Sequence, residues 1–181
     1  MTQVEFISYI ALHSTHSRLN DICIQAGKKS VAELIQASFS TYKLAQDAYA
    51  NNRHIYAELD EARREITPTE FLDGTLEFIV SKDFSDGFDF EKLRPFAQQF
   101  FEEFQKTRKF LHIKFFKLDG DYAELLQSIA EADDNSYASA LKQAISFFVY
   151  MRNIYDSGGR VLVESETGEL KELQEFTKSV S

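Results

Sequence analysis

The chain has 181 residues, of which 44% are hydrophobic, and a formal net charge of −9. This length fits one domain, and the apolar content is enough to bury a core without disulfides or metal. Only two Pro and seven Gly are present, which argues against the many tight turns of an all-β sandwich or barrel. The acidic surface disfavours non-specific attraction to nucleic acid or to anionic lipid.

The single cysteine and the N-terminus give expectations about location. Because Cys23 is alone, a disulfide within the chain is excluded, which favours a reducing compartment. The first residues lack a basic segment followed by an apolar run, so no signal peptide is predicted. No stretch approaches the ~20 uninterrupted apolar residues of a membrane-spanning helix. We therefore expect a cytoplasmic protein without a membrane partner.

The N-terminal part of the chain predicts two helices. Apolar residues at helical spacing favour a first helix over about 4–26, ended by Gly27. Ser30 and Glu33 then form a capping box, in which each side chain accepts a hydrogen bond from the other residue's backbone N–H. This box marks the start of the second helix.

The second helix is predicted to be the longest, over about 31–65, because no Gly or Pro interrupts it. Tyr42, Tyr49 and Tyr56 recur at heptad spacing along it, a pattern typical of a seam between packed helices. Tyrosine is both apolar and polar, so its hydroxyl needs a partner or water when the ring is buried.

The middle of the chain begins at Thr67-Pro68-Thr69-Glu70, which combines a capping box with proline at the first helical position. A third helix is predicted to follow through about residue 79, with a short strand over 76–80 as the alternative. Residues 83–89 are expected to form a loop. A fourth helix over about 95–118 is the most aromatic part of the chain and is expected to lie centrally in the core.

The C-terminal part predicts a fifth helix ending near residue 132 and a sixth over 137–156, ended by Gly158-Gly159. Residues 160–173 favour a small β-hairpin over a terminal amphipathic helix, and 174–181 are a candidate disordered tail. The sequence therefore predicts an all-α, single-domain bundle of about six helices with a small C-terminal hairpin.

Charge is unevenly distributed along the chain. Residues 105–118 contain five basic residues and no acid, whereas residues 119–134 contain six acids and no base. The average charge therefore conceals a polarised molecule, and a partner that recognises this polarity is a better expectation than an active site.

No catalytic motif or cofactor fingerprint is present, so the favoured hypothesis is a non-enzymatic protein that binds and regulates a protein partner without a cofactor. Immunity proteins, antitoxins and inhibitors are the analogous classes. The expected partner is basic, and a homo-oligomer is an open alternative. The candidate contact residues are exposed tyrosines and acids: Tyr42, Tyr49, Tyr56, Asp119, Asp121, Glu124, Asp133 and Asp134.

An alternative hypothesis is a helical RNA-binding or ribonuclease module. Arg108 and His112 resemble the Arg…His pair of the HEPN class of helical ribonucleases, although three residues separate them here, fewer than in that class. The resemblance implies that the two residues act on an RNA backbone, with the histidine as general acid or base. The surrounding Lys106, Lys109, Lys114 and Lys117 would contact phosphates.

A third hypothesis is a metal-binding helical bundle. His13 and His16 lie three residues apart, so on a helix their side chains share a face. His54 is the candidate further ligand if the first two helices are antiparallel. The competing interpretation is a polar strip on a helix surface.

Overall fold

The computed structural model describes residues 7–11, 13–80, 98, 101–102, 105–106, 116–118 and 120–173. These residues combine α-helices with antiparallel strands, so the fold is mixed α/β and the predicted all-α bundle is wrong. The helices are α1 (His13–Gln25), α2 (Val31–Ala50), α5 (Gly120–Ala132) and α6 (Tyr137–Asp156). The strands are β1 (Ile7–Ala11), β2 (Ile55–Leu59), β3 (Ala62–Glu65), β4 (Phe78–Val80), β5 (Phe116–Leu118), β6 (Arg160–Glu164) and β7 (Leu170–Glu172).

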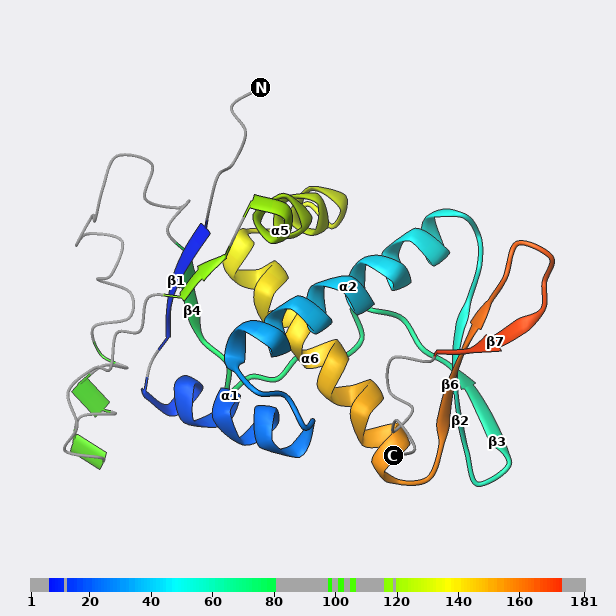
Figure 1. Ribbon diagram of the computed structural model, residues 1–181, viewed down its shortest axis with the longest axis horizontal. Coiled ribbons are helices and arrows are strands. Elements are labelled where there is room, and N and C mark those ends of the chain that lie inside the picture. Colours follow the sequence, from blue (N-terminus) through cyan, green and yellow to red (C-terminus); the bar gives the residue numbers. More distant parts are fainter. Residues whose placement is uncertain are drawn as a thin grey trace.

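The strands form two antiparallel sheets at opposite ends of the helical part (Figure 1). The smaller sheet has the order β4-β1-β5 and the larger one the order β3-β2-β6-β7. Helix α2 leads into β2 and α6 leads into β6, and these two strands pair from Ile55–Val163 to Glu58–Arg160. The larger sheet therefore joins the C-terminal ends of the two longest helices.

The core lies where α2, α5 and α6 pack together. Phe39 and Tyr42 of α2 and Phe147 of α6 are completely buried, as are Leu126 and Ile129 of α5. The rings of Tyr42 and Phe147 meet edge to face with centroids 5.8 Å apart, which is a favoured geometry for aromatic pairs. Burial of each large apolar side chain contributes roughly 1.5–3 kcal/mol, so this cluster holds together the helices from which both sheets extend.

All four helices of the described part end in the same way. The residue after the C-cap has a left-handed φ, and the N–H of the following residue bonds to the carbonyl five residues earlier, which is a Schellman motif. The left-handed residues are Gly27, Asn52, Asp134 and Gly158. The returning bonds are Lys28–Cys23, Arg53–Ala48, Asn135–Ala130 and Gly159–Ile154.

This motif explains why the predicted helix over 31–65 is wrong beyond Ala50. Asn52 adopts φ 54°, a conformation that asparagine tolerates better than most residues, and the chain then turns into β2. Strands β2 and β3 form a hairpin whose two-residue turn, Asp60-Glu61, has positive φ at both positions, as in a type I′ turn. The heptad spacing therefore does not continue into this segment, and Tyr56 lies on a strand.

The predicted helix over 4–26 is correct only from His13 onward. Residues Ile7–Ala11 form β1, the central strand of the smaller sheet, with β4 on one side and β5 on the other. Long-range pairing satisfies the backbone of this segment on both sides, and this outweighs a local spacing that also fits a helix.

The predicted third helix is also wrong. The Thr67–Glu70 capping box is followed by turns, and Phe78–Val80 form β4, in agreement with the strand alternative. Side chains of α6 form hydrogen bonds with the backbone of this segment. The Ser146 hydroxyl accepts from the Asp73 N–H (2.9 Å), and the Gln143 amide donates to the Pro68 carbonyl.

Most of the predicted fourth helix, 95–118, and the expected loop over 83–89 lie outside the described residues. The end of that helix is wrong, because Phe116–Leu118 form β5. The candidate tail over 174–181 also lies outside the described residues.

Several local predictions are confirmed. In the capping box, the Ser30 hydroxyl accepts from the Glu33 N–H (3.2 Å), and the Glu33 carboxylate accepts from the N–H of Lys29, one residue before the predicted donor (2.7 Å). Helices α5 and α6 have the expected bounds to within a residue. The C-terminal hairpin is present as β6 and β7, paired from Leu162–Glu172 to Glu164–Leu170.

Candidate functional site

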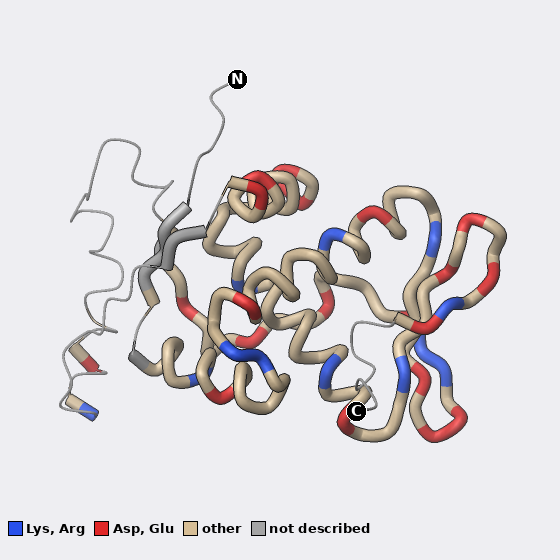
Figure 2. The backbone as a smooth tube through the Cα atoms, viewed as in Figure 1, with Lys and Arg blue, Asp and Glu red and all other residues tan. Residues whose placement is uncertain are grey.

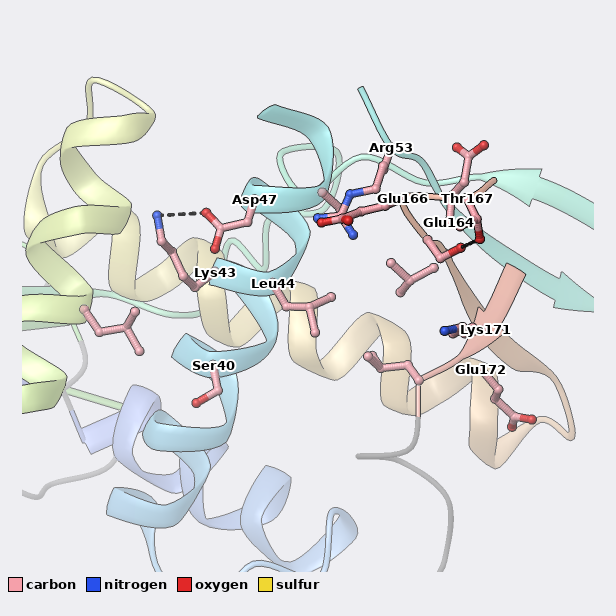
Figure 3. Close-up of a pocket in the computed structure, with 15 residues that line it drawn as sticks. Ser40, Lys43, Leu44, Asp47, Arg53, Glu164, Glu166, Thr167, Lys171 and Glu172 are labelled. Atoms are coloured by element: carbon pink, nitrogen blue, oxygen red, sulfur yellow. Dashed lines mark hydrogen bonds and ion pairs between the residues drawn. The ribbon is translucent and has the colours of Figure 1, made fainter. Parts of the chain in front are cut away.

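A groove of about 880 Å³ separates one face of α2 from the β6–β7 hairpin (Figure 3). Ser40, Leu44 and Ala48 line it at helical spacing from α2, while Val163 and Lys171, which are paired across the hairpin, line it from the opposite side. Because the hairpin reaches past the end of α2, neither surface is completely covered by the other. A groove of this size lies within the range of ligand-binding pockets, roughly 300–1,000 Å³.

The interior of the groove is apolar. Leu44 has 40% of its surface exposed and is one of only four large hydrophobic residues in the described part with so much exposure. Half-buried Leu125, Val163 and Leu173 line the same groove. An exposed leucine alone is ordinary, but one inside a concave apolar site indicates a surface for a ligand.

Charged side chains of both signs surround this interior. On α2, the Lys43 ammonium lies 3.2 Å from the Asp47 carboxylate, so these charges compensate each other. On β6, the Glu164 carboxylate accepts a hydrogen bond from the His54 N–H (3.1 Å). Overall the described surface interleaves acidic and basic segments around the larger sheet, whereas α5 carries acids only (Figure 2).

Arg53 differs from the other charged residues of the groove. Its backbone N–H closes the Schellman motif of α2 by bonding to the Ala48 carbonyl, and its solvent-shielded Nε has no hydrogen-bond partner. Its guanidinium forms no ion pair with any residue of the described part. Figure 3 shows Arg53 at the same end of the groove as Glu166, yet the two side chains are not within ion-pair distance.

A second hollow of about 400 Å³ continues from this end of the groove. It is bounded by the turn after α2, which contributes Asn51 and Asn52, and by the hairpin turn around Gly168. Arg53 and the segment 164–166 line both hollows. The groove is therefore open past Arg53.

Next to the groove, Tyr49, His54 and Glu65 join α2 to the first hairpin. His54 Nδ1 lies 2.6 Å from Glu65 Oε1, and the Tyr49 hydroxyl donates to the same oxygen at 3.3 Å. The hydrogen bond with His54 is the main reason that the pKa of Glu65 is lowered. Burial raises the pKa of Tyr49 to about 12. These contacts fix the segment that carries Arg53.

The raised pKa values of three tyrosines lead us to expect a loss of stability at high pH. Burial raises the pKa values of Tyr42, Tyr49 and Tyr155 above their ordinary value of about 10. The folded protein therefore binds the protons of these three hydroxyls more tightly than the unfolded chain does. Their contribution to the free energy of unfolding is complete below about pH 10 and is lost as the pH rises through the pKa values of the folded state.

The measurement is a tyrosinate absorbance titration followed in parallel by circular dichroism. We expect part of the tyrosinate absorbance of the folded protein to appear only at a pH well above 10, together with unfolding. The urea-unfolded chain should titrate in one step. A folded protein whose eight tyrosines all titrate together near the ordinary value would contradict the prediction.

The tyrosines and acids predicted to contact a partner differ in exposure, and their role in binding stays a prediction. Tyr42 is completely buried, and its hydroxyl donates to Asp133 at 2.6 Å, so it has no exposed surface for a partner. Tyr49 and Tyr56 are half-buried near the first hairpin. Of the remaining acids of that prediction, Asp121 and Glu124 lie on α5 and Asp134 follows it, and all three are exposed. Asp119 lies outside the described residues.

The predicted histidine metal site is not brought together by the described residues. His16 is buried on α1, and its Nε2 lies 3.2 Å from the Asn20 amide. His54 directly precedes β2 and pairs with Glu65. Strand β2 lies well away from α1 (Figure 1). His13 begins α1, but its side chain lies outside the described part. No cluster of three His, Cys, Asp or Glu able to hold a metal occurs among the residues that are described.

The residues of the RNA hypothesis lie mostly outside the described part, which includes neither Arg108 nor His112, and neither Lys109 nor Lys114. Lys106 is exposed. Lys117 lies on β5 opposite Ser8 of β1. That hypothesis therefore stays a prediction.

Sequence reasoning missed the groove because its two sides are far apart in the chain. Leu44 was part of the predicted second helix and residues 163–173 were part of the predicted hairpin, but nothing in either segment indicated that they face each other. The signal that could have been used is local: Leu44 interrupts an otherwise polar stretch of the α2 surface with a large apolar side chain.

None of the described helices is long and apolar enough to cross a membrane. No protein-family model, curated protein sequence or solved structure matches this chain, so the site is interpreted from its own geometry.

Proposed function

We propose that this protein binds a segment of a partner protein in the groove between α2 and the β6–β7 hairpin, and acts by that binding as a regulator or inhibitor. The observation that carries the proposal is the exposed Leu44 inside a concave apolar site. Binding sites of this kind take up an apolar anchor of the ligand in the interior and use the surrounding polar groups for orientation.

The form of the groove favours a peptide segment over a flat protein surface. A helix bounds one side and a hairpin the other, and a second hollow shares Arg53 and residues 164–166 with the groove. Peptide segments commonly bind in grooves of folded proteins and beside exposed strand edges. The interleaved charges on both sides match the mixed polar and charged groups of a peptide.

The test is a selection of random peptides displayed on phage against the immobilised protein, followed by binding measurements on one enriched peptide. Replacement of Leu44 by Asp places a charge in the apolar interior, and we expect it to weaken binding by at least about tenfold, as loss of an anchor contact does. Leu44 is substantially exposed, so the variant should keep its circular dichroism spectrum and melting temperature.

The matched control is Ile24→Asp, which introduces the same charge at a site on α1 that is 78% exposed and outside the groove. It should bind the peptide as the wild type does. If no peptide is enriched, or if both variants bind equally well, the proposal is wrong.

A further inference from the structure

The Arg53 guanidinium, which has no ion pair with a described residue, indicates that the groove prefers a ligand with a carboxylate. We propose that the bound segment carries an aspartate or glutamate side chain whose carboxylate is held by the Arg53 guanidinium. The inference rests on the proposed function, because it names the ligand chemistry of the same groove.

The Arg53 guanidinium has no partner in the described part of the chain. A guanidinium offers five N–H donors in a fixed fork that matches a carboxylate. In Arg53 the shielded Nε has no acceptor, and no described carboxylate pairs with the group. Shielded polar groups are nearly always satisfied in folded proteins, so an orphan on the wall of a groove points to a ligand that completes it.

The acids that line the groove with Arg53 form no ion pair with it. The Glu164 carboxylate is engaged by the backbone N–H of His54, and Asp47 is engaged by Lys43. Glu166 lies on the exposed hairpin turn without reaching Arg53. Of the cations that line the groove, Lys43 is thus paired with Asp47, and Lys171 is exposed and forms no ion pair with a described residue. Arg53 is the one of the three with a shielded donor that lacks an acceptor.

The position of Arg53 in the groove favours an acidic side chain over a C-terminal carboxylate as its ligand. The groove does not end at Arg53, since the second hollow continues past it to Asn51, Asn52 and Gly168. A segment that lies along the groove therefore has chain on both sides of Arg53, which places an internal side chain there. An acidic residue in the ligand is compatible with the net charge of −9 of this protein. The net charge acts at long range on the whole partner, whereas the contact with Arg53 involves a single carboxylate.

The experiment uses the phage-displayed peptides of the preceding test. We expect an aspartate or glutamate at a fixed distance from an apolar residue in the enriched peptides. In the selected peptide, exchange of that acid for its amide should weaken binding to the wild type by about tenfold or more, the range for a hydrogen bond to a charged group. The same exchange should have little effect with Arg53→Gln, since the carboxylate has then lost its partner.

Two further variants make the test specific. Arg160→Gln removes an arginine of the same sheet that is paired with Glu58 outside the groove, and it should keep the preference for the acid. Glu166→Gln removes a nearby negative charge and should tighten binding of the acidic peptide. A peptide with a free C-terminal carboxylate as its only acid should bind no better than its amidated form.

The two proposals fail in different ways. If Leu44-dependent peptides are enriched without an acid, or if Arg53→Gln leaves the acid preference unchanged, the inference about Arg53 is wrong and the proposed function stands. Enrichment of peptides that depend on a terminal carboxylate would also overturn it. Absence of any Leu44-dependent peptide overturns both.

Discussion

Replacement of Phe147 by alanine is expected to lower the free energy of unfolding by about 3–5 kcal/mol, the range measured when a buried aromatic residue is truncated. Phe147 is completely buried on α6, and its ring meets Tyr42 of α2 edge to face. The change removes a large apolar surface and leaves a cavity between α2 and α6, the two helices that lead into the larger sheet.

Urea unfolding followed by circular dichroism measures this effect, with an unchanged dependence on urea concentration as evidence that two-state behaviour is kept. Leu72→Ala is the control, because Leu72 is 59% exposed and its truncation should change stability by no more than about 0.5 kcal/mol. A Phe147 variant that is as stable as the Leu72 variant would show that α2 and α6 do not pack as described.

Gly159→Ala is expected to destabilise the protein by about 1–3 kcal/mol, through overpacking. A β-carbon at this position would lie 2.6 Å from the Glu58 carbonyl oxygen and 2.8 Å from Ile154 Cγ2. Both distances are below van der Waals contact, and the first atom belongs to the backbone of β2. Either β6 must move away from β2, or the end of α6 must shift.

The matched control is Gly74→Ala, because a β-carbon there would meet no atom within 4 Å and the residue has no left-handed φ. Its stability should remain within about 0.5 kcal/mol of the wild type. Equal melting temperatures for the two alanine variants would contradict the close approach of α6 and β2.

The two glycine substitutions also bear on the candidate site. Arg53 lies just before the start of β2, and Glu164 is the last residue of β6, which pairs with β2. The backbone of His54 bonds to Glu164 at this end of the two strands. A shift of β6 would change the width of the groove. Gly159→Ala should therefore weaken peptide binding as well as stability, whereas Gly74→Ala should affect neither.

Local chemistry determined a definite part of this protein from the sequence. The Ser30–Glu33 capping box, helices α5 and α6, and the hairpin of β6 and β7 depend on caps, helical periodicity and turn residues, which act over a few residues. Asn52 marks the limit of this reasoning. Asparagine ends α2 by adopting the left-handed conformation that glycine adopts after α1 and α6, but a sequence scan for Gly and Pro does not detect it.

Only the tertiary structure decided the fold class and the candidate site. Residues 7–11 and 78–80 become strands because each finds a distant partner, and such pairing supplies hydrogen bonds that no local pattern reveals. The groove exists for the same reason: Leu44 and Arg53 lie opposite residues 163–173, more than a hundred positions away. The charge state of Arg53 was evident from its residue type, but its missing partner depends on where every neighbouring carboxylate lies in space.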